Sequence, residues 1–197
     1  RDLRISAEYY RTDFLKQTIV DIDSDIREVK FYDLNGKSYS NNYQIELAYQ
    51  PIDRLDLSAA IRFTDVKANY GDELLIKPLS SKYKGLLTLS YSTLESGWLF
   101  DSSFLLNGNG RIPSTKQNPV EYQREESFPA YLTVNAQITK KIEMLDIYLG
   151  VENLTNYKQD NPIIASDDPF GDYFDASMIW GPIDGTKFYL GVRLSVL

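Results

Sequence analysis

Strict alternation of apolar and polar residues recurs along this chain and limits its fold more than any other feature. In residues 145–152 the apolar face consists of Leu145, Ile147, Leu149 and Val151. The intervening positions, Asp146, Tyr148, Gly150 and Glu152, form the opposite face. A period of two residues is that of a β-strand with one apolar and one polar face. Related segments occur at 3–20, 43–50, 55–64, 83–91, 98–106, 131–139 and 186–197, so we predict about eight strands and no helix.

The connections between these segments alternate in length. Short links fall at 51–54, 92–97 and 140–144. Long ones fall at about 22–40, 67–82, 107–129 and 154–185. Tight turns at one end and long loops at the other are typical of bacterial outer-membrane barrels. We therefore predict an all-β, antiparallel transmembrane β-barrel meander with periplasmic turns and extracellular loops. Its apolar face would contact lipid, and its charged face would line a wet lumen.

Aromatic residues and the end of one strand fit this arrangement. Tyr49, Tyr91 and Trp98 lie beside the short links, where an interfacial girdle belongs. The strand 145–152 ends before Asn153 because the chain leaves hydrocarbon for water there. Asn153-Leu154-Thr155 matches the glycosylation sequon. We interpret that match as accidental, because the predicted setting is a bacterial surface.

The composition excludes several kinds of active site. The 197 residues, one large domain or part of something larger, include no cysteine and no histidine. No disulfide, thiol nucleophile or Ser-His-Asp triad is therefore available within the chain. A net charge of −7 provides no basic stripe for phosphates, which argues against a nucleic-acid partner. We expect no enzymatic activity, no cofactor and no metal site. The sequence begins without Met or a signal pattern, so we expect that processing or truncation removed what came first.

The stretch DIDSDIRE spaces Asp21, Asp23 and Asp25 like the start of a calcium-binding loop. An EF-hand loop would also require Gly at position 26 and Glu at position 32. This chain has Ile26 and Tyr32 there. We therefore predict a solvated loop in preference to a calcium site.

The connection 154–185 is rich in carboxylates and aromatic rings. They are Asp160, Asp167, Asp168, Asp172 and Asp175, with Phe170, Tyr173, Phe174 and Trp180. Such groups can converge to hold calcium, a sugar face or a cationic substrate. Alternatively, the loop packs on its own aromatics while its charges keep it soluble. We favour the second interpretation.

Charged residues also lie on the predicted polar face of the strands. They are Glu8, Glu46, Asp56, Arg62, Asp101, Glu152 and Arg193. They could contact a plug or line a transport path. For any single residue, solvation of a polar interior is the favoured role.

Two stretches near the end of the chain resemble a known family. YLGVENLTNYKQDNPI and DDPFGDYFDASMIWGPIDGTKFYLGVRL are similar to the last hairpin of TonB-dependent outer-membrane receptors, especially those of Bacteroidetes-type bacteria. Upstream, LRISAEYYRTDFLKQTIVD and YSNNYQIELAYQP resemble an ascending strand of that family and the descending strand after it.

The resemblance implies that residues 1–197 are the C-terminal part of a barrel of about 22 strands with a plugged lumen. The plug, the TonB box and the earlier strands are not in this sequence. The implied function is active transport in the bacterial outer membrane. Such a receptor binds a scarce, bulky nutrient (siderophore, cobalamin, glycan or peptide) and imports it with TonB-supplied energy.

The implied partners are the TonB complex, reached through the N-terminal region outside this sequence, outer-membrane lipid, the nutrient ligand and the barrel assembly machinery. A surface lipoprotein is a further candidate. Two other readings stay open. One is a self-contained eight-stranded outer-membrane barrel with a structural or adhesive role, and the other is a soluble β-sandwich that binds a partner.

Overall fold

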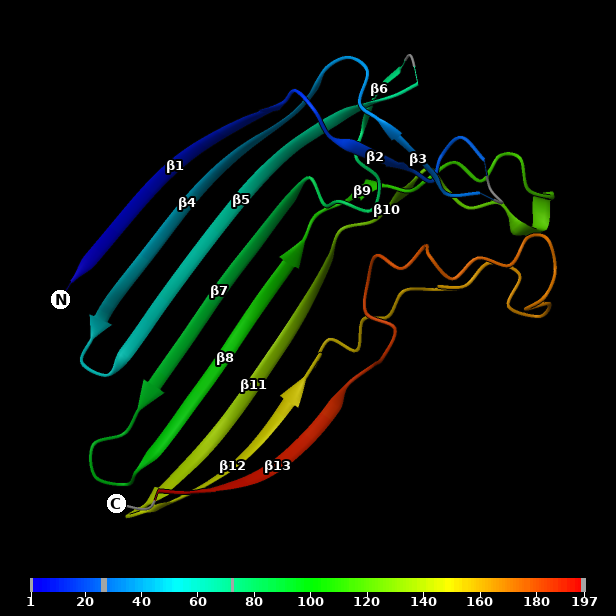
Figure 1. Ribbon diagram of the computed structural model, residues 1–197. Coiled ribbons are helices and arrows are strands. Elements are labelled where there is room, and N and C mark those ends of the chain that lie inside the picture. The colour runs from blue at the N-terminus through cyan, green and yellow to red at the C-terminus, as the bar shows by residue number, and fades with distance from the viewer. Residues whose placement is uncertain (1, 26–27, 72, 196–197) are drawn as a thin grey trace.

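The computed structural model describes residues 2–25, 28–71 and 73–195 and shows one long antiparallel sheet (Figure 1). Eight strands follow one another in chain order across it. They are β1 (Leu3–Phe14), β4 (Ser38–Ile52), β5 (Leu55–Tyr70), β7 (Tyr83–Ser92), β8 (Trp98–Asn107), β11 (Tyr131–Ile142), β12 (Leu145–Glu152) and β13 (Lys187–Leu194). The short β6 (Glu73–Ile76) pairs with the end of β5. The predicted all-β meander is confirmed.

The long connections contain the remaining elements. β2 (Thr18–Asp21) pairs with β3 (Lys30–Asp33), and β9 (Gly110–Arg111) pairs with β10 (Ser127–Phe128). A single 3-10 turn, η1 (Val120–Tyr122), lies between β9 and β10. Within residues 2–25, 28–71 and 73–195, no helix is long and apolar enough to cross a membrane.

Two predicted strand boundaries are wrong. The strand expected at 3–20 ends at Phe14, and residues 18–21 pair with β3 instead of with β4. Gly36 lies between β3 and β4 and has φ 115°, outside the strand region. It therefore separates β3 from β4, so that residues 18–21 have no continuous partner strand with β1. The strand expected at 186–197 ends at Leu194, and Val196 and Leu197 lie outside the described residues.

The register of the ladders confirms the two predicted faces. Residues directly opposite each other in a ladder point to the same side of the sheet. One row across the sheet is mostly polar and runs through Asp56, Ser90, Asp101, Gln137, Gly150 and Tyr189. The adjacent row is mostly apolar and runs through Leu57, Leu89, Ser102, Ala136, Val151 and Phe188. Each face is therefore continuous over all these strands.

The apolar face is exposed, whereas the buried core lies in the connections. Ile5 is 63% exposed and Leu190 is 73% exposed, although both belong to the apolar face. The buried cluster comes from the connections alone and consists of Ile112, Phe128, Ile164, Ala165 and Met178. A soluble β-sandwich buries its apolar faces against each other. No second sheet covers this face in the described part of the chain, so the sandwich interpretation is not supported.

The sheet has two open edges. β1 and β13 are the first and last strands in the order, and no ladder joins them within the described residues. Figure 1 shows them along opposite sides of the sheet. The strands pair in sequence but do not close into a ring.

Candidate functional site

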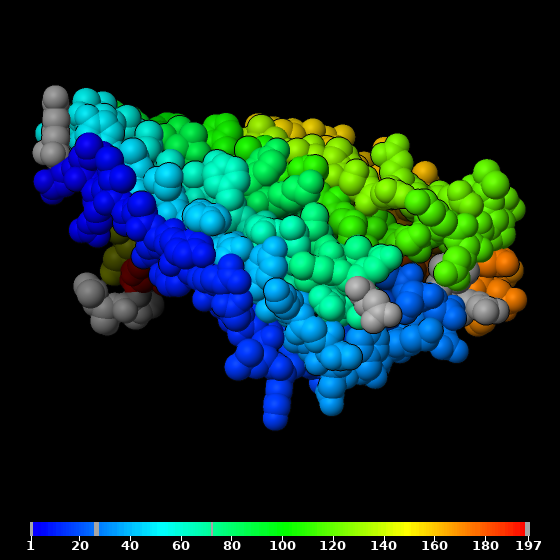
Figure 2. All heavy atoms as spheres, turned by 90° about the horizontal axis from the view of Figure 1, so that it is seen from above, coloured from blue at the N-terminus to red at the C-terminus, as the bar shows by residue number. Residues whose placement is uncertain are grey.

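The long connections gather at one end of the sheet, where they form what we call the loop layer (residues 15–37, 71–82, 108–130 and 153–186). Figure 2 shows its blue, green and orange segments side by side at one end of the molecule. The cluster around Phe128 and Met178 joins the third and fourth of these connections. Because the loop layer has its own core, it is a packed structure that can hold side chains in fixed positions.

Asn153 closes the base of the last connection. It has φ 50° and is 8% exposed, and its backbone N–H donates to Asn135 Oδ1 at 2.9 Å. Its side-chain Nδ2 donates to the carbonyls of Tyr157 at 2.8 Å and Asp184 at 3.1 Å. The nitrogen that a glycan would modify is therefore buried and already bonded. This role of Asn153 explains why the strand stops here.

Gln159 fixes the middle of the same connection. Its side chain donates to the carbonyl of Met178 at 2.8 Å and accepts the N–H groups of Trp180 at 2.9 Å and Gly181 at 3.1 Å. Gln159 is 7% exposed, so these bonds are shielded from water. A connection with almost no regular secondary structure is thus held by two buried amides, Asn153 at its base and Gln159 in its middle.

Asp21, the last residue of β2, and Asp23 stabilise the folded loop layer through hydrogen bonds. The prediction of a solvated loop is therefore wrong for these two residues. Asp21 is 3% exposed and accepts hydrogen bonds from the Ser24 hydroxyl at 2.6 Å and the Tyr32 hydroxyl at 2.9 Å. Burial alone would raise the pKa of Asp21, but the bonds from Ser24, Tyr32 and two backbone amides bring that pKa below its ordinary value. Ile26, the other position that decides against an EF-hand, lies outside the described residues.

Arg111 ties three connections together. Its guanidinium donates to both carboxylate oxygens of Asp23, each at 2.7 Å, and its Nε donates to the carbonyl of Ile76 at 2.7 Å. The Asp23 side chain is 9% exposed, so this bidentate pair is shielded from solvent. No group of three or more His, Cys, Asp or Glu residues that could hold a metal occurs among the described residues.

The aromatics of the last connection pack partly on one another and partly on other elements, and Trp180 meets Tyr157 of the same connection at a ring distance of 6.4 Å. Trp180 stacks on Phe128 at a ring distance of 5.0 Å and 9°, so its partner belongs to a different connection. Tyr157 stacks on Tyr131 of β11 at 4.7 Å and 6°. Phe170, in contrast, is 100% exposed. The predicted packing of the loop on its own aromatics therefore holds in part for Trp180, which also stacks on another connection, and is wrong for Phe170.

The five aspartates of this connection also do not converge. Asp160 lines a cavity of about 290 Å³ together with Phe128, Tyr157 and Trp180. Asp175 lines a different cavity of about 170 Å³ together with Asp25 and Asn118. The described geometry therefore separates these carboxylates and offers no shared calcium site.

The polar face of the sheet carries a hydrogen-bonded stripe at its centre. Ser90 donates to Asp101 at 2.7 Å, Asn135 donates to Ser103 at 3.2 Å, and Tyr189 donates to Gln137 at 3.0 Å. These side chains line an open groove of about 480 Å³. The register places the predicted lumen charges on this face, and Asp101 forms part of the stripe itself.

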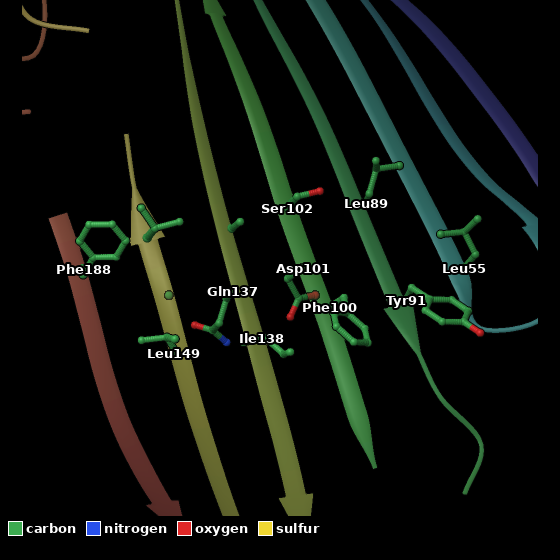
Figure 3. A pocket seen from close by; sticks show the side chains of 13 residues that line it. Leu55, Leu89, Tyr91, Phe100, Asp101, Ser102, Gln137, Ile138, Leu149 and Phe188 are labelled. Atoms are coloured by element: carbon green, nitrogen blue, oxygen red, sulfur yellow. The ribbon is translucent and has the colours of Figure 1, made fainter. Parts of the chain in front are cut away.

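The apolar face of the sheet has a hollow at positions where its side chains are small. Ser102 and Ala136 are register partners, and Leu89, Phe100, Ile138, Leu149 and Phe188 surround them (Figure 3). The hollow has a volume of about 550 Å³. Its lining is mainly aliphatic and aromatic, which suits contact with hydrocarbon.

Sequence reasoning missed several residues of the loop layer. Arg111, Arg124, Tyr157 and Gln159 lie in connections without periodicity, and no motif marks them. Their partners are distant in sequence. Asp23 and Arg111, for example, are separated by 88 positions.

The fold matches solved outer-membrane receptors, whereas no family model and no curated protein matches the sequence. The siderophore receptor PiuA from Acinetobacter baumannii aligns with 98% of this chain at TM-score 0.61 and 16% identity. The ferric-catecholate import receptor Fiu from E. coli K12 aligns with 98% at TM-score 0.66 and 16% identity. The copper transporter OprC aligns with 98% at TM-score 0.67 and 15% identity.

The chain covers only 26%, 25% and 29% of these three proteins, respectively. The fold is therefore that of a barrel segment of TonB-dependent outer-membrane receptors, and the predicted resemblance is confirmed at this level. A relation to Bacteroidetes receptors stays a prediction.

Proposed function

We propose that this chain is the C-terminal part of the barrel of an outer-membrane active-transport receptor. The receptor binds a scarce, bulky nutrient at the cell surface and imports it with energy supplied through TonB. One observation carries the proposal. An open sheet with an exposed apolar face and a continuous polar face bears a packed loop layer at one end only. Such a sheet requires hydrocarbon on one side and a wet interior on the other.

The proposed partners follow from this arrangement. Outer-membrane lipid covers the apolar face, and a plug in the lumen contacts the polar stripe around Asp101 and Gln137. The TonB complex acts through an N-terminal region outside this sequence. The barrel assembly machinery inserts the protein, and a surface lipoprotein is a candidate partner at the loop layer. The protein carries out transport and no covalent chemistry.

A self-contained eight-stranded barrel is the weaker proposal. Unpaired backbone groups in hydrocarbon cost several kcal/mol each, so both β1 and β13 require a partner strand. In an eight-stranded barrel they would pair with each other, and no such ladder is present in the described residues.

Uptake measurements test the proposed function. Cells with and without the full-length protein are supplied with labelled ferric siderophores, cobalamin, oligosaccharides and peptides, each with and without a protonophore. We expect one class of nutrient to enter only in cells that carry the protein and only while the proton gradient is intact. Equal uptake of every class in both strains, or uptake that the protonophore does not reduce, would contradict active transport.

A further inference from the structure

The loop layer contains the cavity of about 290 Å³ that Asp160 lines. Its lining combines aromatic and polar residues, as ligand sites do, and the barrel fold does not require such a cavity. It lies between residues 124–129 of one connection and residues 157–161 and 178–180 of another. Small-molecule sites in proteins are usually about 300–1,000 Å³ and combine an apolar wall with a few polar groups. This cavity is just below that range, which limits its occupant to about one ring.

Its walls are aromatic and rigid. Tyr157 and Trp180 line it with partly exposed rings, each fixed by a stacked neighbour, whereas Phe128 is 2% exposed and backs the Trp180 ring. Gln159, which also lines the cavity, accepts a hydrogen bond from the backbone N–H of Trp180 and so fixes the position of that residue. Pre-ordered rings of this kind bind the C–H face of a flat or chair-shaped ring without first losing conformational freedom.

Its rim is polar and largely without protein partners. Among the described residues, the side chains of Glu125, Ser127, Asp160 and Asn161 make no hydrogen bond or ion pair, although all four line the cavity. Gln159, which also lines the cavity, has its amide occupied by backbone groups of its own connection. The four partner-free side chains are therefore the ones that a ligand in this cavity can bond.

Arg124 adds a guanidinium to the same lining. Its Nε is buried away from water, and one terminal nitrogen donates to the carbonyl of Gln123 at 3.2 Å. The terminal nitrogens carry further N–H groups that an acceptor on a ligand can bond. Arg124 makes no ion pair among the described residues, even though Glu125 and Asp160 line the same cavity.

We infer that this cavity binds a single neutral sugar ring, as a free monosaccharide or as one unit of a longer saccharide. A sugar presents apolar C–H faces to the aromatic walls. Its hydroxyls both donate and accept, so they can bond the carboxylates of Glu125 and Asp160 together with the guanidinium of Arg124. A strongly anionic ligand fits less well, because the rim carries two carboxylates and one guanidinium. That the bound sugar is the imported nutrient, or part of it, rests on the proposed function.

Binding measurements on the full-length protein in detergent test the inference. Glucose, galactose, mannose and N-acetylglucosamine are titrated by calorimetry and by saturation-transfer NMR, with tetramethylammonium as a probe for organic cations. The test variant is Asp160→Asn. The matched control is Asp172→Asn, because Asp172 is an exposed aspartate of the same connection that lies outside this cavity. Both substitutions keep the side-chain shape and affect exposed positions, so both variants should fold.

We expect at least one of the sugars to bind the unmodified protein and the Asp172→Asn variant equally. Asp160→Asn should weaken that binding by roughly tenfold or more, because a hydrogen bond to a charged group is lost. Three results would overturn the inference: no sugar binds, Asp160→Asn binds as well as the control, or only tetramethylammonium binds. The uptake assay is independent of this result. A protein that imports a ferric siderophore but binds no sugar keeps the transport function and loses this site.

Discussion

The phenol ring of Tyr189 lies across Gly150, its register partner on the neighbouring strand β12. A β-carbon at Gly150 would come within 2.0 Å of that ring. The next pair on the same face repeats the contact in reverse, since a β-carbon at Gly191 would come within 2.2 Å of the Tyr148 ring. The two tyrosines meet edge to face at 6.3 Å. Aromatic rings that cover cross-strand glycines pin the register of a sheet, here beside its open edge.

Gly150→Ala should therefore displace Tyr189 and break its hydrogen bond to Gln137. We expect a loss of about 1 kcal/mol or more in the free energy of unfolding, from the broken bond and the displaced ring. Gly85→Ala is the control, because a β-carbon there meets Leu106 at an ordinary 3.4 Å. Denaturant unfolding of the full-length protein in detergent checks both. Equal stability of the two variants would show that the Tyr189–Gly150 contact is unimportant.

The strands could be predicted from the sequence where one of their faces contacts an apolar environment, because apolar and polar residues alternate there. The predicted segment 145–152 coincides with β12, because every residue in it obeys the alternation. β4 and β5 extend further than predicted, to Ser38 and Tyr70, because the outer end of β4 is mostly polar and that of β5 reverses its pattern, with Val66, Ala68 and Tyr70 on the face that is polar in the rest of the strand. In that region Thr64 donates to Asn42 at 3.0 Å, so side-chain bonds support the ladder where hydrophobic patterning has stopped.

The loop layer could not be predicted in this way. Its contacts join connections that have no period and lie far apart in the chain, as the pair of Asp23 and Arg111 shows. The carboxylates of Asp21 and Asp23 were expected in water because sequence shows their charge but not their donors, which are nearby in the chain for Asp21 and 88 positions away for Asp23. The cavity around Tyr157 and Trp180 could not be predicted either, because its walls come from two different connections.

Leu149→Arg tests which face of the sheet contacts lipid. Leu149 is on the apolar face, and arginine near the middle of a lipid-facing strand should cost roughly 2–4 kcal/mol. Thr88→Arg is the control on the polar face, where its register partners are Ser58 and Ser103, and it should cost much less. Refolding of the full-length protein into lipid vesicles measures both. If the vesicles tolerate the two variants equally, the proposed orientation is wrong.

Cysteine labelling tests which end of the sheet faces the cell exterior. The sequence has no cysteine, so a single introduced thiol reports its own position within this segment. Phe170→Cys should react with an impermeant thiol reagent on intact cells, because Phe170 is 100% exposed in the loop layer. Asp53→Cys, in the short turn between β4 and β5, should react only after the outer membrane is opened. The opposite labelling pattern would invert the proposed topology.

Acid should loosen the segment that contains β2 and β3. The pKa of Asp21 in the folded state lies below its ordinary value, so its carboxylate stabilises the folded segment at neutral pH. That contribution is present above about pH 4 and is lost as the pH falls through the lowered pKa. The hydrogen-exchange protection factors of residues 18–25 and 28–33, which are corrected for the slower intrinsic exchange in acid, should fall as the pH is lowered. In Asp21→Asn these protection factors should be low already at neutral pH and should depend less on pH, whereas Asp33→Asn, an exposed change on β3, should behave like the unmodified protein.

The open edges give the last prediction. β1 and β13 end the sheet, and in hydrocarbon each unpaired backbone group costs several kcal/mol, so partner strands from outside this sequence must cover both edges. Ile5 lies on β1 and Leu194 on β13, and the two would be neighbours only if these eight strands closed on themselves. A full-length protein with Ile5→Cys and Leu194→Cys should therefore form no disulfide between these positions under mild oxidation. As a positive control, Leu145→Cys with Leu194→Cys joins register partners of β12 and β13 and should cross-link. A disulfide between positions 5 and 194 at a comparable yield would demonstrate an eight-stranded barrel and refute the larger one.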